Sequence, residues 1–258
     1  MLLNCDLGES YGSWTLGQDA KAMAQIDQAN IACGFHAGDP LVMQSTLSLA
    51  KQHGVMVGAH PGYPDLVGFG RRSMNCSSAE IKAFLLYQMA AMEGMARCQG
   101  LELAYVKPHG ALYNDMMKKA SVRQAIMQAV SQYSQARNQA LSQPLKLMLQ
   151  ATTQAPEHQQ EADALQLELY FEAFADRAYE SDGSLMARSK TGAVLNHDAM
   201  LQQVQQLLDT GIITSACGVS LDLKVDSLCV HGDNNAGIAA IADIRQLIEL
   251  HQPKGAPA

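Results

Sequence analysis

Short apolar runs alternate along the chain with longer stretches in which apolar residues recur at helical spacing. Several of the longer stretches open with Pro, Ser or Asp, which are common at the first turn of a helix. The short runs predict strands at 2–5, 29–33, 55–59, 104–106, 145–149, 167–171, 212–215 and 227–230. The longer stretches predict helices at 40–53, 77–99, 115–138, 156–165, 198–209 and 237–251. The chain is thus predicted to be a series of strand–helix units.

Alternation of this kind requires a mostly parallel sheet, and this number of units in 258 residues favours a closed β/α barrel over an open sheet. A doubly wound open sheet is the alternative. The chain has no low-complexity linker, charge block or long repeat, so residues 1–258 are predicted to form a single barrel domain. Segment 140–166 gives the weakest pattern, because it is rich in Gln and holds one short apolar run.

The composition supports a folded protein and excludes some partners. Hydrophobic residues make up 48% of the chain and charged residues 17%, which argues against disorder. The net charge of −7 provides no basic surface for nucleic acid. The six cysteines form no CxxC pair, and the N-terminus lacks the features of a signal peptide or a membrane span. We therefore expect reduced thiols and a cytoplasmic location.

Polar residues that can do chemistry gather just beyond the predicted strand ends. A single His or Asp after a strand is often a helix cap, but repetition from strand to strand indicates one shared site, because parallel strands end at the same rim. These residues are Asp6, Glu9, His36, Asp39, His60, Asp65, Lys107, His109, Asn114, Glu172, Asp176, Arg177, His231 and Asp233. The histidines away from the strand ends are interpreted as solvated surface groups, and they are His53, His158, His197 and His251.

Two glycine-rich loops support the same location for the site. Gly34 and Gly38 flank His36 at a strand-to-helix turn and allow the backbone to approach a ligand. Segment 68–72 reads GFGRR and presents Arg71 and Arg72, either of which can bind a carboxylate with its two-pronged guanidinium. The chain contains no GxxxxGK[ST] and no GxGxxG after a strand, so it carries no recognisable nucleotide-binding loop.

The residue types at this rim leave two chemistries open. Imidazoles with carboxylates can hold zinc, manganese or iron, which then activates a water. Alternatively, Asp6 or Glu9 activates water without a metal, and Lys107 or a histidine stabilises the oxyanion. The chain has neither HExxH nor GxSxG, so no local motif decides between these chemistries.

The motifs, taken in order, resemble the LamB/YcsF family over nearly the whole chain. They are NCDLGE at 4–9, NIACGFHAGD at 30–39, GAHP at 58–61, GFGRR at 68–72, VKPHGALYN at 106–114, EAFADR at 172–177 and VHGD at 230–233. The resemblance implies a distorted, seven-stranded β/α barrel of the TIM-like type, similar to the glycoside hydrolase/deacetylase fold. It also implies ATP-dependent hydrolysis of the 5-oxoproline (pyroglutamate) lactam to glutamate, together with two partner subunits, B and C.

In that reaction ATP would be a co-substrate bound with the partner subunits, and this chain would supply the barrel pocket. On chemical grounds we expect Asp6 or Glu9 to be the general base and Lys107 and His109 to polarise the lactam oxygen or a phosphate. Glu172 and Asp176 join this catalytic group. The predicted substrate-binding residues are His36, Asp39, His60, Arg72, Asn114, Arg177, His231 and Asp233, with Arg72 or Arg177 holding the substrate carboxylate and His36, His60 and His231 as the candidate ligands of a divalent metal.

Three segments depart from the family pattern. Segment 149–153 lacks the usual small turn, Ala187 stands where a proline is usual, and 234–237 varies the tail of the last motif. The first of these is expected to reshape one wall of the pocket. Two other functions stay open: a stand-alone metal-dependent deacetylase or amidohydrolase acting on a small or carbohydrate substrate, and a binding module without catalysis.

Overall fold

The computed structural model describes residues 1–137, 143–230 and 235–251. Its strands are β1 (Leu2–Leu7), β2 (Gln28–Ala32), β3 (Met56–His60), β4 (Leu103–Val106), β5 (Lys146–Gln150), β6 (Glu168–Phe174), β7 (Ile212–Thr214), β8 (Ser220–Asp222) and β9 (Ser227–Cys229). Its helices are α1 (Asp19–Met23), α2 (Pro40–His53), α3 (Ser78–Cys98), α4 (Gly110–Lys118), α5 (Ala120–Ala136), α6 (Ala155–Asp163), α7 (His197–Thr210) and α8 (Asn235–His251).

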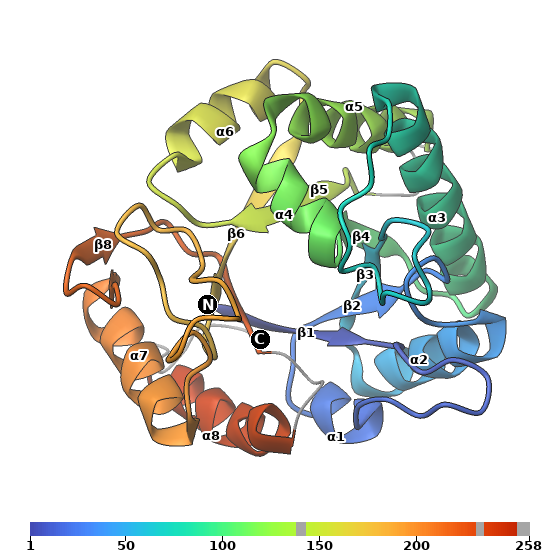
Figure 1. The fold of residues 1–258 in the computed structure, drawn as a ribbon. Helices are drawn as coiled ribbons and strands as arrows, with labels where there is room; N and C mark the ends of the chain where they lie inside the picture. Colours follow the sequence, from blue (N-terminus) through green and yellow to red (C-terminus); the bar gives the residue numbers. More distant parts are fainter. Residues whose placement is uncertain (138–142, 231–234, 252–258) are drawn as a thin grey trace.

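Seven parallel strands close into a barrel in the order β1-β2-β3-β4-β5-β6-β9. The barrel closes where β1 pairs with β9, in the register Leu2 with Ser227 and Asn4 with Cys229. Figure 1 shows the strands at the centre and the helices around them. The prediction of a closed, seven-stranded barrel is confirmed, and the doubly wound alternative is wrong.

Helix ends on the outside of the barrel follow ordinary capping chemistry. Ser77 and Glu80 form a capping box at the start of α3, with each side chain accepting a hydrogen bond from the other residue's backbone N–H. The Asp39 side chain caps α2 by accepting hydrogen bonds from the backbone N–H groups of Leu41 and Val42. In the described part of the chain, no helix is both long enough and apolar enough to cross a membrane.

Two predicted elements differ from the structure. Segment 212–215, predicted as a strand in line with the others, forms β7, which pairs antiparallel with β8 in a separate two-stranded sheet. An apolar run of this length has no feature that tells a barrel strand from a hairpin strand. The single helix predicted at 115–138 is two helices, α4 and α5, because the backbone of Lys119 is extended between them. Residue 138 lies outside the described residues.

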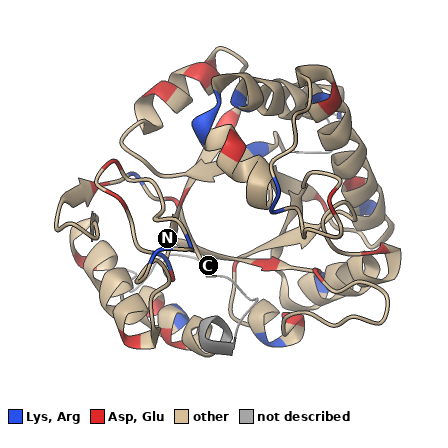
Figure 2. Ribbon diagram, viewed as in Figure 1, with Lys and Arg blue, Asp and Glu red and all other residues tan. Residues whose placement is uncertain are grey.

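The barrel interior is polar, which sets the conditions for the site. Along each strand, alternate residues face inward, so a polar residue at every second position makes a polar interior. In β1 the buried Leu3 and Cys5 belong to the hydrophobic core, whereas Asn4 and Asp6 contact residues of other strands across the interior. Figure 2 shows that most charged residues lie on the helices and loops, so the few on the barrel strands stand out. Asp6 and Glu172 are two of these.

Candidate active site

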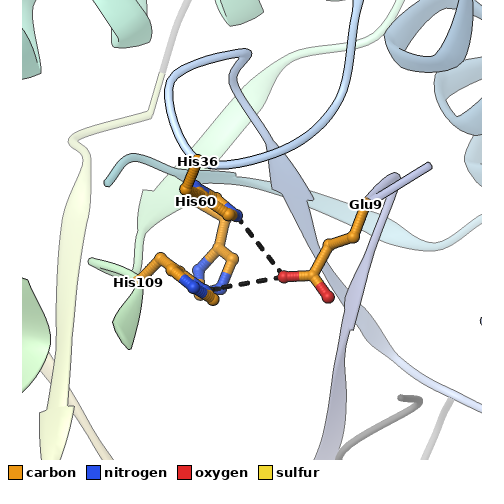
Figure 3. Close-up of side chains that lie close together, drawn as sticks. All are labelled: Glu9, His36, His60 and His109. Carbon is orange, nitrogen blue, oxygen red and sulfur yellow. Dashed lines mark hydrogen bonds and ion pairs between the residues drawn. The ribbon is translucent and has the colours of Figure 1, made fainter. Parts of the chain in front are cut away.

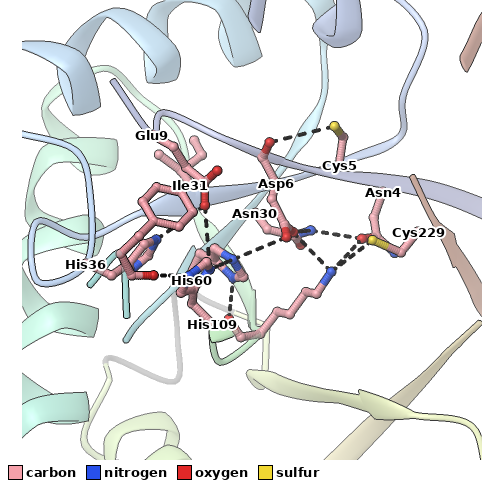
Figure 4. Close-up of polar contacts among 12 residues, drawn as sticks. Asn4, Cys5, Asp6, Glu9, Asn30, Ile31, His36, His60, His109 and Cys229 are labelled. Atoms are coloured by element: carbon pink, nitrogen blue, oxygen red, sulfur yellow. Dashed lines mark hydrogen bonds and ion pairs between the residues drawn. The ribbon is translucent and has the colours of Figure 1, made fainter. Parts of the chain in front are cut away.

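The structure brings seven of the predicted residues together near the carboxyl ends of the barrel strands. Asp6 and Glu172 lie on β1 and β6, and His60 ends β3. The others come from the segments that follow β1, β2 and β4. The seven residues are Asp6, Glu9, His36, His60, Lys107, His109 and Glu172, and Figure 4 shows most of their contacts.

Lys107 is the central cation of this group. Its Nζ lies 3.0 Å from Asp6 Oδ1 and 3.0 Å from Glu172 Oε2. It also donates to Asn4 Oδ1 at 3.2 Å and lies 3.2 Å from Cys229 Sγ. Burial by itself lowers the pKa of Lys107, but the charge of Asp6, followed by the contributions of Cys229 and Glu172, outweighs burial and raises this pKa well above the usual value. The side chain is therefore a fixed, permanently charged ammonium.

A layer of uncharged side chains supports this ammonium from inside the barrel. Asn30 Nδ2 donates to Asn4 Oδ1 and to Asp6 Oδ1, both at 2.8 Å, and Tyr105 OH donates to Asn30 Oδ1 at 2.7 Å. Tyr105 has room because the facing residue is Gly58, where an added Cβ would lie 2.2 Å from the Tyr105 ring. The carboxylate of Asp6 is thereby held in place by two donors, Lys107 and Asn30.

This supporting layer is not predicted from the sequence. Its members lie inside the predicted strands, whereas the candidate residues were chosen from the strand ends. They are Asn4, Asn30, Tyr105 and Cys229. The signal was present as a period of two, since Asn4 precedes Asp6 by two residues and Tyr105 precedes Lys107 by two. A residue two positions before a chemically active strand-end residue faces the same interior.

The three histidines and Glu9 form a second group beside the first, shown in Figure 3. The rings of His36 and His109 stack with centroids 3.7 Å apart and planes 3° apart. Glu9 Oε1 lies 3.4 Å from His36 Nε2 and 3.5 Å from His109 Nδ1. His60 connects the two groups, because its Nε2 lies 2.9 Å from His109 Nδ1 and 3.4 Å from Asp6 Oδ2.

Burial dominates the protonation of this second group. It lowers the pKa of His36 and of His109 below the usual value, and the neighbouring imidazoles lower both further. Burial also raises the pKa of Glu9, against the attraction of His109. Neutral imidazoles are therefore favoured over imidazolium ions at His36 and His109.

A cavity of about 810 Å³ opens beside these groups. Asp6, His60 and Lys107 line it, while the lining residues of the described chain do not include Glu9, His36 or His109. Two of the places that depart from the family pattern also line it, namely Gln150, Thr152 and Thr153 of segment 149–153, and Ala187. The expectation that segment 149–153 reshapes one wall of the pocket relative to the family stays a prediction.

The cavity wall carries more positive than negative charge. Besides Lys107, the cationic lining residues of the described chain are Arg71, Lys118, Arg177 and Arg188. Arg177 is the candidate predicted to hold a substrate carboxylate, and burial, followed by the charge of Arg188, lowers its pKa. Lys118 and Arg188 were missed, because neither follows a strand end directly. This wall suits an anionic ligand.

The remaining predicted residues lie in different places. Asn114 lines the cavity, and Asp176 is buried just beyond β6 outside the lining. Arg72 is also absent from the lining, and its guanidinium, with a side chain 67% exposed, pairs with Asp65. His231 and Asp233 lie outside the described residues. His158, interpreted from sequence as a surface histidine, is in fact buried on α6.

Asp39 was predicted to bind substrate, but its carboxylate is engaged by the backbone. In addition to capping α2, its Oδ2 accepts a hydrogen bond from the Gly12 N–H at 2.8 Å. These donors lower the pKa of Asp39 below the usual value for a carboxyl group. A lowered pKa means that the ionised carboxylate stabilises the fold above about pH 4, and that this contribution is lost as the pH falls through the pKa of the folded state.

Replacing Asp39 by Ala is therefore expected to reduce stability and leave turnover unchanged. Loss of the cap should lower the midpoint temperature of unfolding by about 2–4 °C. Differential scanning calorimetry and steady-state kinetics check the two halves separately. A raised KM with unchanged stability would instead identify Asp39 as a ligand of the substrate.

A closed β/α barrel with a lysine–carboxylate centre and a cationic cavity at the carboxyl ends of its strands defines a barrel enzyme. The chain belongs to the LamB/YcsF family, which it matches over residues 1–257.

Curated relatives are similar over nearly their whole length. The 5-oxoprolinase A subunit of Pseudomonas fluorescens (strain Pf0-1) is 50% identical over 250 residues, which is 96% of each chain. The corresponding A subunit of Vibrio parahaemolyticus is 47% identical over 95% of this chain and 94% of the relative.

Two solved structures are similar to this fold. The lactam utilization protein from Thermus thermophilus superposes with a TM-score of 0.85 at 37% identity, covering 97% of this chain and 96% of that one. A putative cellobiose-phosphate cleavage protein from Enterococcus faecalis gives a TM-score of 0.52 at 11% identity, covering 97% and 94%. The second match shows a shared fold alone.

Proposed function

We propose that this chain is the barrel component of an ATP-dependent 5-oxoprolinase, which hydrolyses the lactam of 5-oxo-L-proline to L-glutamate. The observation that carries the proposal is the near-complete match to curated A subunits of 5-oxoprolinase at 46–50% identity. The site is consistent with this reaction, because opening an amide ring needs a base for water and a cation for the developing oxyanion.

In this proposal Asp6 and Lys107, which both line the cavity, have separate roles in catalysis. The Asp6 carboxylate accepts a proton from the attacking water, and the Lys107 ammonium stabilises the negative charge on the former lactam oxygen. Before this attack, the γ-phosphoryl group of ATP is transferred to the lactam oxygen and ADP leaves. Water then adds to the activated ring carbon, and the C–N bond breaks as the nitrogen takes up a proton. A second water hydrolyses the resulting acyl phosphate, which releases phosphate and glutamate. Asp6 is preferred to Glu9 as the base because Asp6 lines the cavity.

The cationic wall binds the anionic parts of the substrate. Arg177 and Arg71 line the cavity and are the groups proposed to hold the carboxylate of 5-oxoproline. They take the place of Arg72, which is paired with Asp65. A cavity of about 810 Å³ is larger than this small lactam needs, since pockets of about 300–1,000 Å³ serve drug-sized ligands. The remaining space fits a phosphoryl group on an activated lactam.

Two partner subunits, B and C, complete the enzyme in this proposal. ATP is used as the co-substrate that activates the stable amide, and it is bound with the partners, since this chain has no recognisable nucleotide-binding motif. We place the reaction in the cytoplasm. All six cysteines are free thiols, which is consistent with a reducing compartment.

The test measures glutamate release from 5-oxoproline, with and without ATP, by this chain alone and by the chain mixed with its B and C subunits. We expect glutamate only from the complete mixture with ATP. No glutamate from a correctly assembled complex would contradict the proposed substrate. Turnover by the chain alone without ATP would instead support the stand-alone deacetylase or amidohydrolase.

A further inference from the structure

The group formed by Glu9, His36, His60 and His109 contains polar atoms that the described chain leaves unsatisfied. Glu9 Oε1 and both ring nitrogens of His36 are buried without a hydrogen-bond partner among the described residues. The side chains are 0–8% exposed, so bulk water does not compensate. Unpartnered buried polar atoms are costly, and in native proteins they point to a missing ligand or a functional role.

Hydrogen bonds to the backbone fix the tautomers of two of the rings. His60 Nδ1 lies 2.7 Å from the carbonyl oxygen of Lys107, and His109 Nε2 lies 2.9 Å from the carbonyl oxygen of Phe69. A carbonyl oxygen only accepts, so each of these nitrogens carries its proton. In the neutral rings, His60 Nε2 and His109 Nδ1 are then both bare lone pairs.

Those two lone pairs face each other at 2.9 Å, with the Glu9 carboxylate 3.5 Å from one of them. Three electron-rich atoms converge, and the described protein atoms provide no proton between the rings. Such an arrangement is repulsive unless a positive charge lies among the atoms. Backbone carbonyls that orient the outer nitrogens of ligand histidines also commonly surround metal sites.

Two of the measured spacings match a coordination shell, while the 2.9 Å between His60 Nε2 and His109 Nδ1 is shorter and would widen by about 0.4 Å around an ion. A tetrahedral ion at about 2.0–2.1 Å from each ligand atom sets the ligand atoms about 3.3–3.4 Å apart. The contacts of Glu9 Oε1 with His36 Nε2 and His109 Nδ1 measure 3.4 and 3.5 Å. One potential ligand atom from each of the four residues lies within 4.8 Å of the others.

We propose that Glu9, His36, His60 and His109 bind one divalent transition-metal ion, with zinc as the best fit. Three imidazoles and one carboxylate are ligands that suit zinc, whereas magnesium prefers oxygen ligands. The site lies beside the cavity rather than in its wall, and of the four residues His60 alone belongs to both. The ion therefore orients His60 against Asp6, 3.4 Å away. The set differs from the sequence-based candidates by including Glu9 and His109.

The loop above the site is shaped to allow this arrangement. Gly70 has a φ of +62°, and a Cβ there would lie 2.7 Å from His36 and 2.9 Å from His109. The loop backbone consequently packs directly on the two stacked rings and excludes water from them. Its neighbour Phe69 supplies the carbonyl that fixes His109.

The test uses the whole chain without a polyhistidine tag, stripped with a chelator and dialysed. Titration with Zn²⁺ in a calorimeter, followed by metal analysis after gel filtration, is expected to give one equivalent per chain, while Mg²⁺ gives none. The Glu9→Gln and His36→Ala variants should each bind Zn²⁺ at least about 100-fold more weakly. Co²⁺ bound to the wild-type chain should show the visible absorption of a tetrahedral ion.

Two control variants and a folding measurement keep the test decisive. His53→Ala removes an exposed histidine of α2, and His158→Gln removes a buried one of α6; both should bind Zn²⁺ like the wild type. Circular dichroism melting without metal shows whether each variant is folded. If the wild type bound zinc no more tightly than the folded Glu9→Gln variant, the proposal would be overturned. A proton shared between His60 and His109 would then explain their close contact.

Metal binding is measured on the isolated chain without substrate. A chain that binds zinc but yields no glutamate in the complete enzyme would contradict the proposed reaction and support the metal site. A complete enzyme that yields glutamate, built from a chain that binds no zinc, would contradict the metal site and leave the proposed reaction intact.

Discussion

Replacing Asp6 by Asn is expected to lower kcat of the reconstituted, ATP-supplied enzyme by about 10²–10⁴-fold, the usual contribution of a general base. Asn keeps the size of the side chain and an oxygen that accepts from Lys107, but it does not take a proton from water. Lys107 and Asn30 hold the side chain at 3.0 and 2.8 Å, so the geometry should persist. Initial rates of glutamate release measure the effect.

Asp65→Asn is the matched control for this variant. Asp65 is also a buried carboxylate beyond a strand end, but it pairs with Arg72 outside the cavity lining. Its replacement should leave kcat unchanged. If the Asp6→Asn enzyme were as active as this control, Asp6 would be excluded as the general base. Glu9 would then be the next candidate.

Replacing Lys107 by Met is expected to lower the free energy of unfolding by about 3–5 kcal/mol, the cost of breaking a buried ion pair by removing one partner. The Asp6 and Glu172 carboxylates would lose the ammonium that lies 3.0 Å from each. Activity should be lost as well, because the cation at the cavity floor is gone. Urea unfolding and glutamate release measure the two effects.

A double variant separates the two roles of Lys107. Combining Lys107→Met with Glu172→Gln removes one of the uncompensated charges and should recover part of the lost stability without recovering activity. Lys119→Met is the control, since Lys119 pairs with Asp115 at the same 3.0 Å but is 52% exposed, and its removal should cost about 0–1 kcal/mol. Equal costs at the two lysines would show that the buried ion pair is not a source of stability.

The sequence was sufficient to predict the barrel but not the full length of its strands. Strands predicted at 2–5 and 167–171 continue to Leu7 and Phe174. Each was ended too early because a charged residue, Asp6 or Glu172, was interpreted as the start of a loop. In a barrel with a polar interior, a charge at an alternate position is compatible with a continuing strand.

The candidate site was predictable in its location and only partly in its organisation. Parallel strands share one rim, so the convergence of Asp6, His60 and Lys107 follows from their strand-end positions. The spacing of residues along the sequence does not show which side chains line the cavity and which belong to the buried histidine group. It depends on contacts such as the Phe69 carbonyl on His109, which exist only once the loop after β3 has folded over the rings.

The pairing of β1 with β9 also bears on how the protein is made. Asn4 and Asp6 leave the ribosome more than 200 residues before Cys229, which β9 contributes to the same centre. Until β9 arrives, β1 and β6 present open edges, and Lys107 has two carboxylates beside it without the walls that exclude water. A nascent or truncated chain consequently carries no working centre, and its unpaired strand edges make it a natural client for chaperones.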